Sequence, residues 1–138
     1  MTTLPPSDVA LVWLQRAQSD LNLAQVAFET QGVMLEDACF HAQQCAEKAL
    51  KALLLTLRID FPRTHAIAVL LHLLREAPID VPDNIGEAFL LSQYAVETRY
   101  PGEWEPVTAE ETQTALRLAT EVFVWAKTAI VLQRTRRE

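Results

Sequence analysis

Apolar residues recur along the chain with the three-to-four-residue spacing of an α-helix, in five successive segments. These segments cover, approximately, residues 8–28, 35–58, 64–76, 83–97 and 108–133. Nowhere does the sequence show the strict two-residue alternation of a half-buried β-strand. The pattern therefore predicts an all-α protein.

Four of the five segments are long, and prolines or a glycine mark the links between them. Long helices joined by short links favour an antiparallel up-and-down four-helix bundle, to which residues 64–76 add one short extra helix. The length of 138 residues predicts a single domain over residues 1–138, with a core of about 8–130 and a short basic tail at 134–138. Half of the residues are hydrophobic and only three are glycine, which also favours helices.

The second segment carries a polar stripe on a helix that is otherwise small and apolar. One side of its helical wheel holds Ala42, Cys45 and Ala49. The opposite side gathers, within about 140°, the polar residues Gln43, Gln44, Glu47, Lys48 and Lys51. Large apolar residues border that polar side: Phe40, Leu54 and Leu55. Two interpretations remain open, a contact surface or a solvated helix face on which Glu47 and Lys51 form an i,i+4 pair.

Two further polar residues lie on faces that should be apolar. Asp20 falls among the apolar residues of the first segment, where a carboxylate requires a cationic or hydrogen-bonding partner. Arg99 continues the inward stripe of Phe89, Ser92 and Val96, so it too should point inward or into a groove. We expect Asp20 to meet Lys48 or Arg99, in a polar cluster that contains Asp20, Glu47, Lys48 and Arg99. Such a cluster is either a functional site or a structural buried ion pair.

Composition and charge exclude several classes of protein. The net charge of −6 argues against a general nucleic-acid coat protein, and we expect no DNA partner. Cys39 and Cys45 lie six residues apart on one helix, too far apart to bridge, and are expected as reduced buried thiols. The sequence shows neither a signal peptide nor an 18-residue apolar run, so we expect a cytoplasmic protein without a membrane span. No metal-binding or phosphate-loop motif is present, so we expect no metal and no cofactor.

Three groups of residues resemble the HEPN domain family when they are taken together and in order. They are the Trp13-x3-Ala17-x2-Asp20 pattern, the QQxxEKAxKALL block at residues 43–54, and Thr64-His65 followed by Arg99-Tyr100-Pro101. The resemblance covers about residues 8–130. It implies a five-helix fold around a four-helix bundle, usually as a two-fold dimer. It also implies a role like that of many prokaryotic members, which are encoded beside a minimal nucleotidyltransferase as toxin–antitoxin pairs.

Active members of the family carry an Arg-x4–6-His motif that supplies a metal-independent endoribonuclease site. Arg99 is the counterpart of the motif arginine, but residues 100–107 contain no histidine. His65 is the histidine that we consider as an unconventional base. Three functions remain open: a partner of the nucleotidyltransferase that binds nucleotide or RNA, an active ribonuclease toxin, or a purely structural adaptor. The incomplete motif favours a protein without this ribonuclease activity, and the sequence leaves open whether the protein is an enzyme.

A phosphate ligand is expected near Arg99, because arginine offers a planar fork that matches phosphate oxygens. Lys48, Lys51 and Arg63 are the expected auxiliary contacts, and Tyr100 or Trp104 is expected to stack on a base. We also expect a C2 homodimer. The apolar residues assigned to its surface are Phe40, Leu54, Leu55 and Tyr94.

Overall fold

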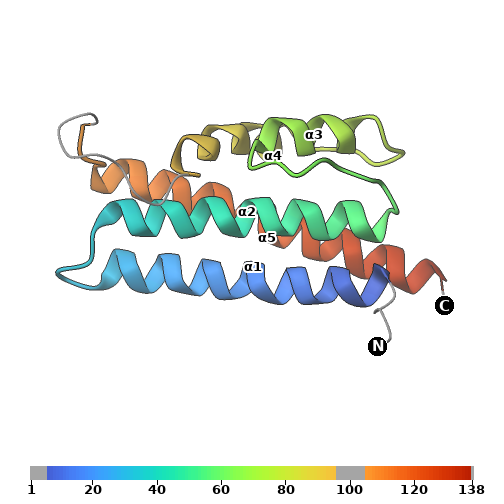
Figure 1. The fold of residues 1–138 in the computed structure, drawn as a ribbon, viewed down its shortest axis with the longest axis horizontal. Coiled ribbons are helices and arrows are strands. Elements are labelled where there is room, and N and C mark those ends of the chain that lie inside the picture. The colour runs from blue at the N-terminus through green and yellow to red at the C-terminus, as the bar shows by residue number, and fades with distance from the viewer. Residues whose placement is uncertain (1–5, 96–104, 138) are drawn as a thin grey trace.

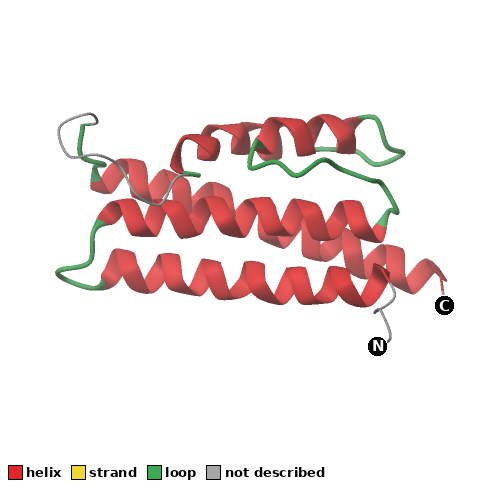
Figure 2. Ribbon diagram, in the orientation of Figure 1, coloured by secondary structure: helices red, strands yellow, loops and turns green. Residues whose placement is uncertain are grey.

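The computed structural model describes residues 6–95 and 105–137, and helices account for most of them (Figures 1 and 2). Over these residues there is no strand, so the all-α prediction is confirmed. The elements are α1 (Pro6–Glu29), α2 (Leu35–Thr56), α3 (Ile67–Arg75), α4 (Asp83–Gly86), the 3-10 helix η1 (Glu87–Tyr94) and α5 (Ala109–Arg137).

The helices form an up-and-down bundle with α2 packed against both α1 and α5 (Figure 1). α1 runs opposite to α2, and α5 runs in the same direction as α2. The continuous α4–η1 segment runs opposite to both and takes the fourth position of the bundle, while α3 is the short extra helix. The predicted architecture is therefore confirmed, although its fourth member is much shorter than expected.

Small side chains explain why α2 lies at the centre of the bundle. Ala42, Cys45, Ala49 and Ala52 are completely buried, which lets the neighbouring helices approach closely. Cys39 and Cys45 are free thiols, as predicted. Burial and the charge of Asp20 raise the pKa of the Cys45 thiol, with only a partial offset from Lys48, so this thiol stays protonated.

The predicted helix at 83–97 departs most from the prediction, because most of its described part is a 3-10 helix. A 3-10 helix has three residues per turn, so its inward positions recur at every third residue. The buried residues follow that period: Ile85, Ala88, Leu91 and Tyr94. The prediction assumed the α-helical period and placed Phe89 inside, but Phe89 is 51% exposed.

The same change of period corrects part of the expected dimer surface. Tyr94 is buried, and its hydroxyl donates a hydrogen bond to Oε2 of Glu111 at 3.1 Å. Leu54 is completely buried within the chain as well. These two residues therefore do not belong to an exposed apolar surface, whereas Phe40 and Leu55 are half-buried.

Residues 57–66 return over α2 as an irregular segment, and this segment positions the site described below. α2 ends at Thr56 rather than at Arg58, which adopts a left-handed conformation with φ of 61°. The backbone N–H of Ile59 then donates to the carbonyl of Leu54 at 2.9 Å, a hydrogen bond typical of a Schellman C-cap. α3 begins at Ile67, three residues later than predicted. The chain therefore carries His65 back towards the middle of α2.

Among the described residues, no helix is long and apolar enough to span a membrane.

Candidate functional site

The polar stripe of α2 is covered by other parts of the same chain. Gln43 is completely buried, Glu47 is 3% exposed and Lys51 is 7% exposed. Gln44 and Lys48 are half-buried. A freely solvated helix face is therefore wrong for the central residues of the stripe, and the surface that they contact belongs to α1 and to the segment 57–66.

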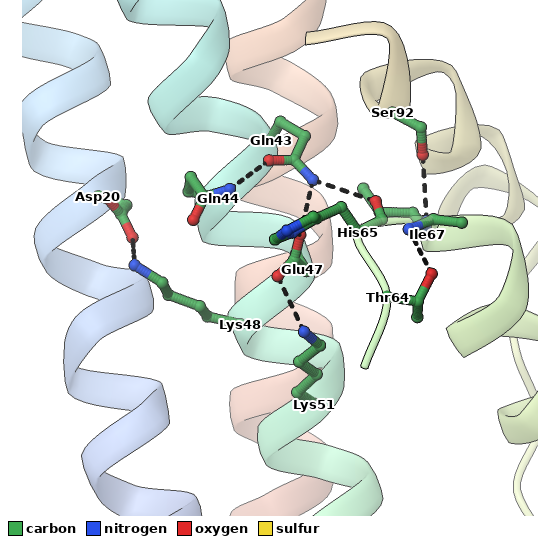
Figure 3. Close-up of polar contacts among 11 residues, drawn as sticks. Asp20, Gln43, Gln44, Glu47, Lys48, Lys51, Thr64, His65, Ile67 and Ser92 are labelled. Atoms are coloured by element: carbon green, nitrogen blue, oxygen red, sulfur yellow. Dashed lines mark hydrogen bonds and ion pairs between the residues drawn. The ribbon is translucent and has the colours of Figure 1, made fainter. Parts of the chain in front are cut away.

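Glu47 is the centre of a buried hydrogen-bond network (Figure 3). Its Oε1 accepts hydrogen bonds from Nε2 of Gln43 and from Nδ1 of His65, both at 2.9 Å. Its Oε2 accepts a hydrogen bond from Nζ of Lys51 at 3.0 Å. Burial alone would raise the pKa of Glu47, but the hydrogen bonds from Gln43, Lys51 and His65 outweigh burial, so the pKa is lowered. Glu47 is therefore a stable carboxylate, and because a carboxylate can only accept, Nδ1 of His65 carries the proton.

The buried ammonium of Lys51 neutralises the carboxylate of Glu47. Its ammonium lies 5.6 Å from the ring centroid of Trp13 in α1 and 5.9 Å from that of Phe61 in the segment 57–66. Both distances are within the range of cation–π attraction. The predicted Glu47–Lys51 pair therefore exists, but as a buried ion pair between two aromatic rings.

Asp20 is the centre of a second, similar group on the other side of the stripe. Its Oδ2 accepts a hydrogen bond from Nζ of Lys48 at 2.6 Å, and its Oδ1 accepts one from Nδ1 of His41 at 2.9 Å. The predicted contact between Asp20 and Lys48 is therefore confirmed. His41 was missed, although it lies seven residues before Lys48 and hence on the same side of α2. Each of the two buried carboxylates thus accepts from one lysine and one histidine.

The backbone around His65 is fixed by hydrogen bonds with the side chains of Gln43, Thr64 and Ser92. The carbonyl of His65 accepts from Nε2 of Gln43 at 3.4 Å. The hydroxyl of Thr64 accepts from the N–H of Ala66 at 3.0 Å, and the hydroxyl of Ser92 accepts from the N–H of Ile67 at 3.1 Å (Figure 3). The His65 side chain is nevertheless 71% exposed. His65 is thus held on its inner side by Glu47 while most of its ring faces solvent.

The remaining predicted site residues are only partly brought together. Arg63 is exposed and lies two residues before His65. Arg99, Tyr100 and Trp104 lie outside the described residues, so their predicted roles stay predictions. Within residues 6–95 and 105–137, no group of three or more potential ligands could hold a metal ion.

Comparison with known proteins finds relatives that match this chain along most of its length. The HEPN domain family matches residues 10–129. The candidate toxin MJ1304 of Methanocaldococcus jannaschii is 33% identical, with 83% of each chain covered. The crystal structure of ST0689, an archaeal HEPN homologue, is 32% identical with a TM-score of 0.70, covering 88% of this chain and 97% of that one.

A second solved structure agrees with these two relatives. The crystal structure of TT1696 from Thermus thermophilus is 36% identical with a TM-score of 0.71, and the match covers 87% of this chain and 97% of that one. The family match, the sequence relative and both solved structures span most of the chain. The chain belongs to the HEPN domain family.

Proposed function

We propose that this chain is the HEPN component of a toxin–antitoxin-type module, in which it pairs with a minimal nucleotidyltransferase. The observation that carries the proposal is the likeness, along 83% of the chain, to a candidate toxin. The motif order from Gln43-Gln44 to Arg99-Tyr100-Pro101 adds the resemblance to family members that are encoded beside such nucleotidyltransferases. A cytoplasmic homodimer is the form in which we expect the protein to act.

In this module the chain binds the phosphate of a nucleotide or of RNA beside the polar stripe of α2. Arg63 is exposed two residues before His65, which supports a phosphate contact on this side, whereas the half-buried Lys48 at the edge of the stripe is paired with Asp20. Arg99 is the principal contact in the proposal, with Tyr100 or Trp104 stacking on a base. Lys51 acts indirectly, because its ammonium is buried against Glu47.

Co-expression with the nucleotidyltransferase encoded beside the gene tests the partnership. We expect the two proteins to co-elute from a sizing column, and we expect growth arrest by one of them to be relieved by the other. Light scattering measures the oligomeric state of the chain on its own. Separate elution at tens of micromolar, together with no effect on growth, would refute the module.

Phosphate binding has its own test, in which a fluorescent single-stranded RNA is titrated at several salt concentrations. Affinity should fall steeply with salt, because binding to a phosphate backbone releases counterions. Arg99→Ala should weaken binding far more than removing Arg134, Arg136 and Arg137 together. A protein that loses binding only with the tail would contradict the proposed location. A protein that binds nothing but still pairs with the nucleotidyltransferase would be a structural adaptor.

A metal-independent ribonuclease is the second candidate, and the contact between Glu47 and His65 favours it. A buried carboxylate holds Nδ1 of an exposed imidazole at 2.9 Å, which leaves Nε2 available to accept a proton from a ribose hydroxyl. Purified protein is incubated with RNA in the presence of a chelator. Cleavage that disappears in both Arg99→Ala and His65→Gln would establish this function.

A further inference from the structure

We infer that His65 is itself a phosphate contact, and that it binds phosphate as an imidazolium whose counter-ion is Glu47. The inference rests on the proposed phosphate binding and adds a residue, a protonation state and a regulation to it. It concerns the phosphate group that nucleotides and RNA share.

The buried charges on this side of the bundle balance one another. Asp20 is paired with Lys48 and Glu47 with Lys51, so the two carboxylates and the two lysines of these groups cancel. The cluster therefore has no cation left over for an anionic ligand. A phosphate that approaches this side therefore gains no net attraction from these four groups, and a positive charge that favours it must come from another residue.

The hydrogen bond between His65 and Glu47 determines what the other ring nitrogen of His65 can bind. In the neutral imidazole Nδ1–H donates to Glu47, so Nε2 is an acceptor and cannot bind a phosphate oxygen. Protonation turns Nε2 into a donor and supplies the missing charge at the same position. Glu47 stabilises that charged form through a contact of 2.9 Å, and the 71% exposure of the side chain leaves room for a ligand.

The other charged groups near His65 do not remove the need for a proton. Among the described residues they are Glu47, Lys48 and Lys51 on α2, Asp20 on α1, and Arg58, Asp60 and Arg63 on the segment 57–66. On the remaining side η1 contributes the hydroxyl of Ser92, and the first turn of α3 is apolar. Arg63 is exposed and can assist, but among the described residues no buried partner holds it in the way that Glu47 holds His65.

Proton uptake and phosphate binding are therefore linked. An imidazole changes its charge between pH 5 and 8, so binding at this site should strengthen as the pH falls through that range. For one linked proton the limit is about tenfold in affinity per pH unit. Binding to exposed lysines and arginines would not change in this range, because these residues stay charged throughout.

The experiment measures affinity and proton uptake with two probes. One probe is a 2′-O-methylated single-stranded uridine 12-mer, which cannot be cleaved through a 2′-hydroxyl, and the other is uridine 5′-monophosphate. Titration calorimetry at pH 6 and pH 8, in two buffers of different ionisation enthalpy, gives both quantities. We expect several-fold tighter binding at pH 6, with proton uptake on binding. The probe that shows this behaviour identifies the source of the phosphate as RNA or mononucleotide.

His65→Gln is the test variant, because glutamine can still donate a hydrogen bond to Glu47 but cannot titrate. It should lose the proton uptake and the pH dependence. His72→Gln is the matched control, since His72 is 70% exposed on α3 and lies 3.8 Å from the exposed Glu76. His41→Gln measures how much of the proton uptake comes from the group around Asp20. If His65→Gln does not fold, the proton uptake of the other two variants is compared with that of the unmodified protein. Equal uptake in all three proteins leaves His65, out of the three histidines, as the one that takes up the proton.

Three results would overturn the inference. They are equal affinity at pH 6 and pH 8, a pH dependence that survives in His65→Gln, and no binding of either probe at pH 6. The first two leave phosphate binding in place and remove only the role of His65. The third removes phosphate binding at this side, while the pairing with a nucleotidyltransferase is decided separately by co-elution.

Discussion

Replacing Glu47 by alanine should destabilise the fold by about 3–5 kcal/mol, the range for removing one partner of a buried ion pair. The variant strands the ammonium of Lys51, which is only 7% exposed. Trp13 and Phe61 lie 5.6 and 5.9 Å from that ammonium, near the limit of cation–π attraction, so they compensate for only a small part of the loss. His65 and Gln43 lose their hydrogen-bond acceptor at the same time.

Urea denaturation followed by circular dichroism measures this loss. With a slope of about 2 kcal/mol per molar urea, the midpoint should fall by about 2 M. Glu121→Ala is the matched control, because Glu121 also forms an i,i+4 pair, with Arg117 at 3.1 Å, but its side chain is 31% exposed and that of Arg117 is 53% exposed. Its cost should remain within about 0.5 kcal/mol. If Glu47→Ala costs no more than Glu121→Ala, the pair is not buried in solution and the reasoning fails.

Three further predictions follow from the same contacts. Asp20→Ala should lower the free energy of unfolding, measured in urea, by about 2–3 kcal/mol. This loss is smaller than that of Glu47→Ala because the side chain of Lys48 is 22% exposed and can reach water. A loss below about 0.5 kcal/mol would show that Asp20 is exposed. The pKa of Glu47 is lowered in the folded protein, so the unfolded chain binds more protons at low pH. The stability that Glu47 contributes is therefore complete above about pH 4.3, the ordinary pKa of glutamate, and is lost as the pH falls through the lowered pKa. Thermal unfolding between pH 3 and 6 should show a shallower loss of stability for Glu47→Gln than for the unmodified protein. Arg58→Gly should stabilise the fold by up to about 1 kcal/mol and raise the urea midpoint, because Arg58 has φ of 61° and glycine adopts that conformation without strain. An unchanged or lower midpoint would contradict this account.

The helices were predictable because burial in this fold follows the α-helical period over long segments. α1, α2 and α5 begin and end within a few residues of their predicted limits. The period failed only at residues 87–94, where a 3-10 helix places Ala88 and Leu91 inside instead of Phe89. Helical wheels cannot detect this change, because the choice between the two helix types depends on the packing of η1 against α2, α3 and α5.

The site was predictable where one helix faces another, and unpredictable where a loop was involved. Asp20 lies on the buried side of α1, so its need for a cation led to Lys48 on α2. His65 reaches Glu47 only because residues 57–66 turn back over α2 after the left-handed Arg58. No periodic pattern describes that path. The expected inward orientation of Arg99 followed from the α-helical stripe of Phe89, and this stripe does not exist in η1.

Packing alone does not explain why Glu47 and Lys51 occupy the interior of the bundle. A buried ion pair is weak evidence for stability, and hydrophobic residues of similar volume often stabilise a fold at least as well. Leu50, Leu53 and Leu54, on the same helix, show that this interior accepts large apolar side chains. What the ion pair adds is a permanent carboxylate under an exposed imidazole, which is the feature that proton-linked phosphate binding requires.

The double variant Glu47→Leu/Lys51→Met separates these two roles. It removes both charges together, so its stability should lie within about 1 kcal/mol of that of the unmodified protein, far above that of Glu47→Ala. His65 would then lack its counter-ion, and affinity for the phosphate probe that binds the unmodified protein should rise less between pH 8 and pH 6 than it does in the unmodified protein. A double variant as unstable as Glu47→Ala would show that the ion pair holds the bundle together. A double variant that is stable and keeps the full pH dependence would show that His65 binds phosphate without help from Glu47.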